Sequence, residues 1–263
     1  MFKKIIILII CLFIATNGDC GIDFDLVDDR VTITPAASID NMSAITLSVW
    51  INSDVSGAQR RIVSKSGADT TGWRLRILAN DTLGFVCDYT PTSDMGSIST
   101  TTITEGSWQH ILVTWDGSAT ATNVHIYING TEVTYTTQTN GDNTRANDST
   151  AGLFVGMRSD GAQPFGGEIT EVAIWNVVLT APQIALLANS RIKGIPLQIQ
   201  PSALKVYLPM DDQTTGTSAD ADRVRDLSGN GNNGTGNDGT NNTGLSWSSE
   251  VILSYPSAIL TGN

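Results

Sequence analysis

An alternation of apolar and polar residues with a period of two recurs along this chain and constrains its fold more than any other feature. In residues 45–51 the apolar residues share one face, and in residues 73–79 two arginines alternate with three apolar side chains. The pattern returns in residues 110–115, 124–128, 152–157 and 168–175. Turn pairs such as Asn129-Gly130 separate these runs, which is typical of antiparallel strands. The sequence therefore predicts an all-β fold with two antiparallel sheets packed as a sandwich.

One segment departs from this period and predicts a short helix near 181–190. Thr180 is the expected N-cap, Pro182 lies in the first turn, and Gln183 completes a capping box. The apolar face would be formed by Ile184, Leu187 and Ala188, with Gly194 able to end the helix.

The N-terminus reads as a secretory signal peptide over residues 1–18. Two lysines precede an apolar run over 5–15, which is too short to span a bilayer, and small and polar residues follow it. A lipid anchor on Cys20 is disfavoured because Asp19, rather than a small residue, precedes it. We therefore expect a secreted or cell-surface protein with a cleaved signal and no membrane insertion.

The formal net charge of −11 becomes two units more negative when Lys3 and Lys4 leave with the signal. Such a chain should repel nucleic acid and anionic membranes, so neither is an expected partner. Its acids either bind cations or simply keep an exported surface soluble.

Cys20 and Cys87 remain in the mature chain, and they either form a disulfide or stay as two free thiols.

Several motifs in order resemble the LamG-like jelly-roll family of the concanavalin A-like lectin/glucanase superfamily, which also holds laminin G domains and pentraxins. They are FDLVDDRVTI (24–33), RIVSKSG (61–67), GSWQHILVTWDGS (106–118), IYINGTEV (126–133), the run 152–189 and DLSGNGNNGT (226–235). The resemblance covers about residues 22–250 and implies a two-sheet jelly-roll sandwich. It does not imply one activity, because lectins, adhesion modules, appendages and glycosidases share this fold.

The resemblance also suggests the domain limits. Residues 19–255 would form one LamG-like domain, followed by a tail over 256–263. In many relatives the segment similar to 206–235 stands before the first strand, whereas here it follows the helix. We expect residues 204–255 to complete the same sandwich, because chain termini usually lie close together. The alternative is that they begin a second repeat.

The run 225–247 is rich in glycine and asparagine, and we interpret its first part as an ordered loop rather than a linker. Such residues allow a tight bend that turns oxygens inward, as Ca²⁺ requires. The family resemblance also implies calcium in many members. The six candidate ligands are Asp226, Asn230, Asn232, Asp28, Asp29 and Glu171. The spacing does not match an EF-hand, and a tight turn without metal is the alternative.

The sequence argues against an enzyme. Glucanases of the superfamily carry alternating carboxylates on one strand, and residues 168–172 would be the matching place. Strict alternation puts Glu168, Thr170 and Val172 on one face and Glu171 on the other, so these carboxylates would not converge. The two histidines, His110 and His125, lie within predicted strands and suggest no catalytic relay.

We therefore predict a non-catalytic recognition or adhesion module that binds carbohydrate or an extracellular protein, with a structural Ca²⁺ ion. Among the tryptophans, Trp73 and Trp247 are the candidates for stacking on a sugar ring, with core packing as the alternative for each. Another hypothesis is a structural surface or appendage component that self-associates. A glycoside hydrolase is a further alternative.

Overall fold

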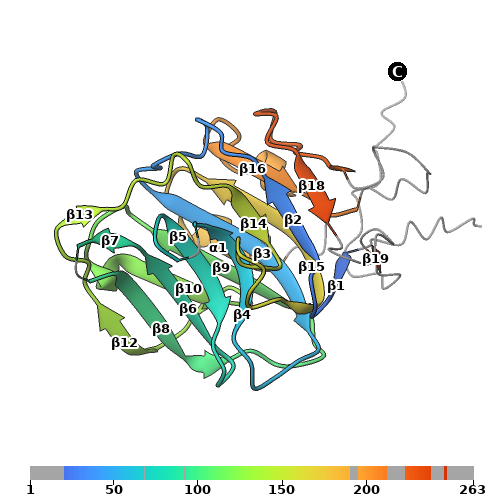
Figure 1. Cartoon of the computed structure of the whole chain (residues 1–263), viewed down its shortest axis with the longest axis horizontal. Helices are drawn as coiled ribbons and strands as arrows, with labels where there is room; N and C mark the ends of the chain where they lie inside the picture. The colour runs from blue at the N-terminus through green and yellow to red at the C-terminus, as the bar shows by residue number, and fades with distance from the viewer. Residues whose placement is uncertain are drawn as a thin grey trace, which may run out of the picture.

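The computed structural model describes residues 21–67, 69–91, 93–189, 195–211, 223–237 and 246–247. The predicted signal peptide, Cys20 and the predicted tail lie outside these residues. The described chain forms two large antiparallel sheets, which we call sheet A and sheet B (Figure 1). The prediction of a two-sheet antiparallel sandwich is confirmed.

Sheet A has the order β11-β10-β9-β3-β15-β1-β19, and β16 also pairs with β15. Its strands are β1 (Ile22–Asp25), β3 (Ile45–Ser53), β9 (Gln109–Trp115), β10 (Val124–Ile128), β11 (Thr131–Glu132), β15 (Gly166–Trp175), β16 (Leu204–Leu208) and β19 (Ser246–Trp247).

Sheet B has the order β12-β8-β6-β5-β4-β14-β2-β18-β17 and faces the viewer in Figure 1. Its strands are β2 (Arg30–Ile33), β4 (Arg60–Lys65), β5 (Trp73–Ile77), β6 (Thr82–Cys87), β8 (Met95–Thr102), β12 (Tyr135–Thr139), β14 (Leu153–Val155), β17 (Arg223–Val224) and β18 (Gly234–Asn237). A small separate sheet pairs β7 (Tyr89–Thr90) with β13 (Thr144–Arg145).

The alternation in the sequence explains the core between the sheets. Because successive side chains of a strand point to opposite faces, each strand sends every second residue inward. The buried rings of Trp73, Phe85 and Trp115 lie at the centre, with the Phe85 centroid 6.3 Å from that of Trp73 and 6.1 Å from that of Trp115. The outward residues of the same strands are therefore left to form the functional surfaces.

The helix α1 (Ala181–Asn189) covers part of the outer face of sheet A. Gln183 Oε1 accepts hydrogen bonds from the Thr180 backbone N–H at 2.9 Å and from the Thr180 hydroxyl at 3.0 Å, as a capping residue would. Ile184 and Leu187 pack against Trp175 in a second apolar cluster, so the predicted apolar face is confirmed. The 3₁₀ turn η2 (Ile195–Gln198) joins the same layer, and another, η1 (Ala121–Asn123), precedes β10.

The C-terminal strands belong to the same sandwich. β16 pairs with β15 and β19 with β1 in sheet A, while β18 pairs with β2 in sheet B. The described part of residues 204–255 therefore adds strands to both sheets. Within the described part of the chain, no helix is both long and apolar enough to cross a membrane.

A charged group lies inside the sandwich where β4 ends. Lys65 is fully buried, and its Nζ donates to the carbonyl oxygens of Asp148 and Ala151, each at 2.8 Å. The same nitrogen lies 2.9 Å from Asp40 Oδ1 and 3.7 Å from Asp148 Oδ1. Arg145 completes the group, because its Nη2 donates to Asp148 Oδ2 at 2.9 Å. This network ties the loops 36–44 and 144–151 to sheet B.

Candidate functional site

The glycine- and asparagine-rich segment forms an ordered turn around the carboxylate of Asp226. Asp226 Oδ1 accepts the backbone N–H groups of Tyr207 and Ser228, each at 2.9 Å. Its Oδ2 accepts the Asn232 N–H and the Ser228 hydroxyl, each at 2.8 Å. The carboxylate is thus surrounded by hydrogen-bond donors, which is the opposite of what a cation ligand needs.

The two asparagines of this turn also face carbonyl groups. Asn230 Nδ2 donates to the carbonyl of Leu204 at 2.9 Å, and Asn232 Nδ2 donates to that of Lys205 at 2.7 Å. Asn232 Oδ1 accepts the Ser38 hydroxyl at 3.0 Å. Asp226, Asn230 and Asn232 therefore hold the turn against β16. The structure favours the tight turn over the predicted calcium loop.

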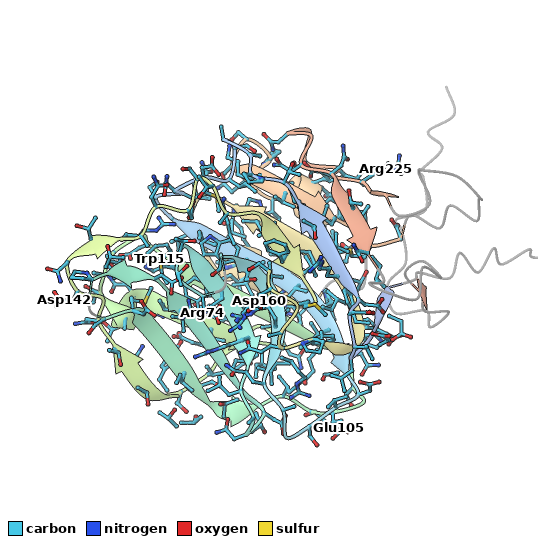
Figure 2. The ribbon with its side chains drawn as sticks, viewed as in Figure 1. Arg74, Glu105, Trp115, Asp142, Asp160 and Arg225 are labelled. Carbon is cyan, nitrogen blue, oxygen red and sulfur yellow. The ribbon has the colours of Figure 1, made fainter. Side chains whose placement is uncertain are left out.

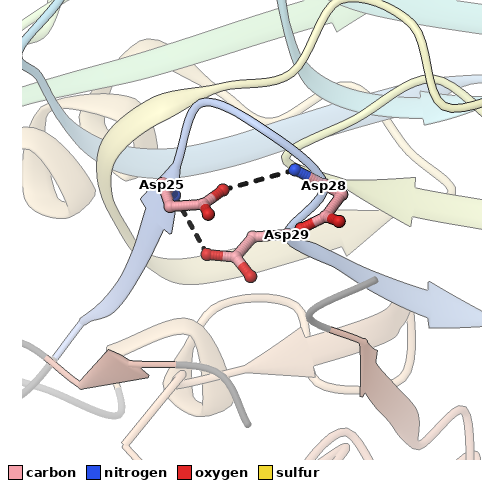
Figure 3. A group of neighbouring side chains, drawn as sticks. All are labelled: Asp25, Asp28 and Asp29. Carbon is pink, nitrogen blue, oxygen red and sulfur yellow. Dashed lines mark hydrogen bonds between the residues drawn. The ribbon is translucent and has the colours of Figure 1, made fainter. Parts of the chain in front are cut away.

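The other predicted acidic ligands lie in different places. Asp28 and Asp29 follow β1, and Asp25 joins them in a group whose carboxylate oxygens lie within 4.8 Å of one another (Figure 3). Among the described residues this is the only such group of three or more. Asp25 Oδ1 accepts the N–H groups of Val27 at 2.8 Å and Asp28 at 3.3 Å, and the Asp25 N–H donates to Asp29 Oδ2 at 2.9 Å. Three carboxylates suit a hard cation in charge and ligand type.

Glu171 does not join these aspartates. It is the positive-φ residue of a register shift in β15, and the Tyr207 hydroxyl donates to its carboxylate at 2.9 Å. The same shift sends Val172 into the core between the sheets. The prediction that Val172 shares a face with Glu168 and Thr170 is therefore wrong, because a bulge interrupts the alternation.

The predicted aromatic and cysteine residues are placed as follows. Trp73 is fully buried and its ring packs on Phe85, so it offers no stacking face and the core-packing alternative holds for it. The backbone of Trp247 pairs with β1, and its side chain lies outside what the structure describes. Cys87 is a buried thiol whose pKa is raised to about 12 by burial. Its pairing with Cys20 remains a prediction, because Cys20 lies outside the described residues.

A charged network that the sequence did not single out lies on the outer face of sheet B. Cross-strand register places Arg61 of β4 opposite Arg76 of β5, and Arg74 opposite Ser64. We call this surface the arginine face and define it by Arg61, Ser64, Arg74, Arg76 and Asp88. Arg74 of this face is labelled in Figure 2.

Asp69 connects the arginines of this face. Both of its oxygens accept Arg61 Nη2, at 2.8 and 2.9 Å, and Asp69 Oδ2 also accepts Arg158 Nη1 at 3.0 Å. Arg74 bonds Asp88 and lies 3.4 Å from Asp94. Although burial opposes ionisation, Arg61 and Arg74 hold the pKa of Asp69 below its usual value. These pairs order the guanidinium groups before any ligand arrives.

Polar atoms without a hydrogen-bond partner gather on the same face. Within the described part of the chain, those on this face are Arg61 Nε and Nη1, Arg74 Nε, Arg76 Nε, Ser64 Oγ and Asp88 Oδ2. Such atoms are rare in native structures, and they commonly mark positions where water or a ligand binds. Burial lowers the pKa of Arg61 to about 10 and raises the pKa of Asp88 to about 6. The arginine face therefore holds desolvated charge with unused hydrogen-bonding capacity.

The outer face of sheet A carries the opposite charge near β1. Asp23 lies opposite Glu168, and Glu168 Oε2 accepts Asn52 Nδ2 at 2.9 Å. Burial, followed by the charges of Glu168, Asp54 and Asp25, raises the pKa of Asp23. Acidic groups therefore crowd this end of sheet A while guanidinium groups occupy the arginine face.

A pocket lies between the loops at one end of the sandwich. Its volume is about 420 Å³, and it is lined by Val55, Ser56, Asp81, Thr102, Ile103, Thr104 and Glu105. Asp81 is held by an ion pair with the fully buried Arg60. The pocket thus presents hydroxyls and carboxylates, but none of its lining atoms is a buried polar atom without a partner.

Comparison with known proteins decides the family. A laminin G family model, described as the concanavalin A-like lectin/glucanases superfamily, matches residues 25–185, more than half of the chain. The chain belongs to this superfamily. Comparison with curated protein sequences yields no match.

The fold is also similar to that of solved structures. A candidate carbohydrate-binding protein from Bacteroides ovatus ATCC 8483 has a TM-score of 0.61 and 18% identity, over 90% of this chain and 61% of that one. This chain therefore spans less than two thirds of that protein. A heptameric SAP-like pentraxin from Limulus polyphemus has a TM-score of 0.49 and 17% identity, over 68% of this chain and 85% of its own.

Two arrangements in this superfamily member resemble parts of catalytic sites. Glu168 and Glu171 lie on one strand, but each is held by a different neighbour, Asn52 and Tyr207. Ser48 Oγ lies 2.8 Å from His110 Nε2, and both residues are buried. Burial lowers the pKa of His110 to about 3, so this imidazole is a weak base at neutral pH.

The pKa of His110 predicts a loss of stability in acid. The folded-state pKa of about 3 lies below the unfolded value of about 6.5, so the unfolded chain takes up the proton first as the pH falls. We expect His110 to destabilise the fold by about 2 kcal/mol on going from pH 7 to pH 5. Urea unfolding of His110→Gln at both pH values should show a pH dependence smaller by this amount. The matched variant at the exposed His125, His125→Gln, should retain most of the pH dependence of stability. An equal pH dependence in wild type and His110→Gln would contradict the assignment of the low pKa to His110.

Proposed function

We propose that the chain is an exported, non-catalytic module that binds carbohydrate through the arginine face. The observation that carries this proposal is the gathering of buried, unpartnered polar atoms on that face. Sugar hydroxyls are both donors and acceptors, so they can bond Arg61 and Arg76 as well as Asp88. Asp69 already orders Arg61, which lowers the entropy lost on binding.

An aromatic ring lies beside these polar groups. Phe154 of β14 is opposite Ser64 of β4, on the outer face of sheet B, and it is half-buried. Its ring lies close over Gly152, where an added Cβ would meet the ring at 3.2 Å. An aromatic side chain held in this way can provide an apolar platform for a pyranose ring next to polar groups that bond its hydroxyls.

Two further findings support the proposal. The superfamily to which the chain belongs includes lectins by its own description. The Bacteroides ovatus structure that shares the fold is a candidate carbohydrate-binding protein. An exported location also agrees with the predicted signal peptide.

The proposal is tested with the purified chain on a panel of neutral and acidic oligosaccharides, followed by calorimetry on the strongest binder. Phe154→Ala should weaken binding about five- to thirtyfold, because stacking and ring burial on such a platform contribute about 1–2 kcal/mol. Val178→Ala removes an exposed apolar side chain elsewhere and should leave affinity unchanged. An affinity that is unchanged in Phe154→Ala would place the binding site on another surface. A blank across the panel, together with self-association, would favour a structural component.

A calcium ion at Asp25, Asp28 and Asp29 is a further part of the proposal. Bound there, the cation would offset most of the negative charge of the three adjacent carboxylates and stabilise the turn between β1 and β2. It supplies no chemistry to the arginine face. The turn also carries Leu26 at a positive φ of 66°, a conformation that an added ligand would help to hold.

Calcium should therefore stabilise the fold. Adding Ca²⁺ at a hundred times its Kd should raise the free energy of unfolding by about 2.7 kcal/mol. Thermal unfolding of metal-free protein with and without Ca²⁺ measures this effect. Asp28→Asn should abolish the shift, whereas Asp226→Asn should retain it. An unchanged midpoint at millimolar Ca²⁺ would remove calcium from the proposal.

A further inference from the structure

Arg76 is a half-buried cation without an acidic partner. Among the described residues its side chain makes no ion pair and no hydrogen bond. The side chains of Arg61, Arg74 and Arg158, in contrast, each pair with an aspartate. Burial and the nearby charge of Arg74 lower the pKa of Arg76. A desolvated cation is costly unless a counter-charge compensates it. The fold thus maintains a guanidinium group that no carboxylate among the described residues contacts, although Asp69, Asp88 and Asp94 attract it from a longer distance.

The Arg76 side chain packs beside Leu78 over Gly84, its neighbour across the β5–β6 pair. An added Cβ at Gly84 would meet Leu78 Cδ1 at 2.9 Å and Arg76 Nε at 3.6 Å. The Arg76 side chain therefore lies across a strand position that has no side chain of its own. On the other side, Arg76 is opposite Arg61 of β4.

Arg61 provides a second, independent observation. Its side chain is fully buried, and only Nη2 is bonded, to Asp69 and Gln163. Nε and Nη1 have no partner among the described residues. Guanidinium groups bind carboxylate and sulfate oxygens in a bidentate manner, so the half-buried Arg76 can receive such an anion, and the fully buried Arg61 beside it adds positive charge rather than a direct contact.

The distribution of charge over the molecule agrees with this chemistry. The chain is acidic overall, and the β1 end of sheet A concentrates Asp23, Glu168 and Asp54. An anionic ligand would be repelled from that surface. On the arginine face it would instead meet Arg76, with Arg61 and Arg74 beside it. Asp69 and Asp88 pair with these two neighbours and not with Arg76.

We propose that the ligand of the arginine face carries an oxyanion, a carboxylate or a sulfate, that binds at Arg76 beside Arg61 and Arg74. This inference rests on the proposed function and assigns its ligand to the acidic glycans. The sugar ring would then lie towards Phe154, and the oxyanion would supply the counter-charge that Arg76 lacks.

The test compares each acidic oligosaccharide with its neutral counterpart. Calorimetry on the full chain uses oligogalacturonate against the matching neutral galactose oligomer, and a sulfated against a desulfated glycosaminoglycan fragment. We expect at least tenfold tighter binding of one acidic member than of its neutral counterpart. The pair of ligands that shows this difference identifies the oxyanion as a carboxylate or a sulfate. Because the attraction is between charges, the difference should shrink as NaCl rises from 50 to 500 mM.

Variants locate the oxyanion. Arg76→Gln should remove most of the preference for the acidic member, because it should weaken binding of that member much more than binding of the neutral one. Arg76→Lys keeps the charge but loses the bidentate geometry, so it should retain part of the preference. Arg225→Gln, which removes one exposed arginine far from Arg74 in Figure 2, controls for net charge. Thermal unfolding of each variant verifies that it is folded.

The outcomes separate the inference from the proposed function. Equal affinity for acidic and neutral members, with binding still sensitive to Phe154→Ala, would overturn the oxyanion site and retain a neutral carbohydrate site. A preference that survives Arg76→Gln would place the anion elsewhere and overturn the inference. No binding of any member would overturn both.

Discussion

Lys65→Met is expected to lower the free energy of unfolding by about 3–5 kcal/mol, the usual effect of removing one partner from a buried ion pair. Lys65 has no exposed surface, and its ammonium group bonds Asp40 and two carbonyl oxygens. Methionine fills a similar volume, so the loss measures charge and hydrogen bonding rather than a cavity. The carbonyl oxygens of Asp148 and Ala151 would be left without the donor they have here.

Chemical unfolding monitored by tryptophan fluorescence measures this loss. Lys205→Met is the matched control, because Lys205 is half-exposed and its Nζ makes only a 3.4 Å contact with the Ser202 carbonyl. It should change the stability by less than about 0.5 kcal/mol. If Lys65→Met also stayed within this range, Asp148 would be held by Arg145 and Asn41 alone, and the ammonium group would contribute little.

Local sequence patterns predicted the fold well, because each carries its own physical cause. The period of two in 45–51 reappears as β3, with Leu47 and Val49 in the core. The capping residues Thr180 and Gln183 mark the start of α1. These features depend on neighbouring residues only, so a single sequence contains enough information to place them.

The irregularities of the strands were not predictable from alternation. Glu171 adopts a φ of +54° at the shift in β15, which transfers Val172 to the core and Glu171 to Tyr207. A bulge adds one residue to one strand, and its place is set by the register of the partner strands. The assignment of faces within 168–172 was therefore correct up to Thr170 and wrong after it.

The arginine face was missed for a similar reason. The alternation of Arg74 and Arg76 with apolar residues was visible, and an outward face is ordinarily a solvated one. Only the pairing of β4 with β5 brings Arg61 beside Arg76 and shows that some guanidinium atoms are buried.

For the calcium prediction, the sequence showed the composition of the loop but not the direction of its hydrogen bonds. Only the structure shows that Asp226 accepts N–H groups.

Asp226→Ala is expected to destabilise the fold by about 2–4 kcal/mol in the absence of any metal. The substitution removes an acceptor that serves the backbone N–H groups of Tyr207, Ser228 and Asn232 and the Ser228 hydroxyl. A hydrogen bond to a charged group contributes about 1.5–3 kcal/mol, and solvent can replace part of this because Asp226 is only half-buried. The effect should reach the adjoining strand, since one of these donors lies in β16.

The comparison of two substitutions separates this role from that of a calcium ligand. Asp226→Asn keeps one carboxamide oxygen and should lose about half as much stability as Asp226→Ala, whether calcium or a chelator is present. Glu105→Ala removes an exposed carboxylate and should be nearly neutral. If both Asp226 variants were as stable as wild type in chelator and less stable only in calcium, the hydrogen-bonded turn would be the wrong account and Asp226 would be a cation ligand. If Asp226 instead holds the turn through the hydrogen bonds described above, both variants should lose stability in calcium and in chelator alike.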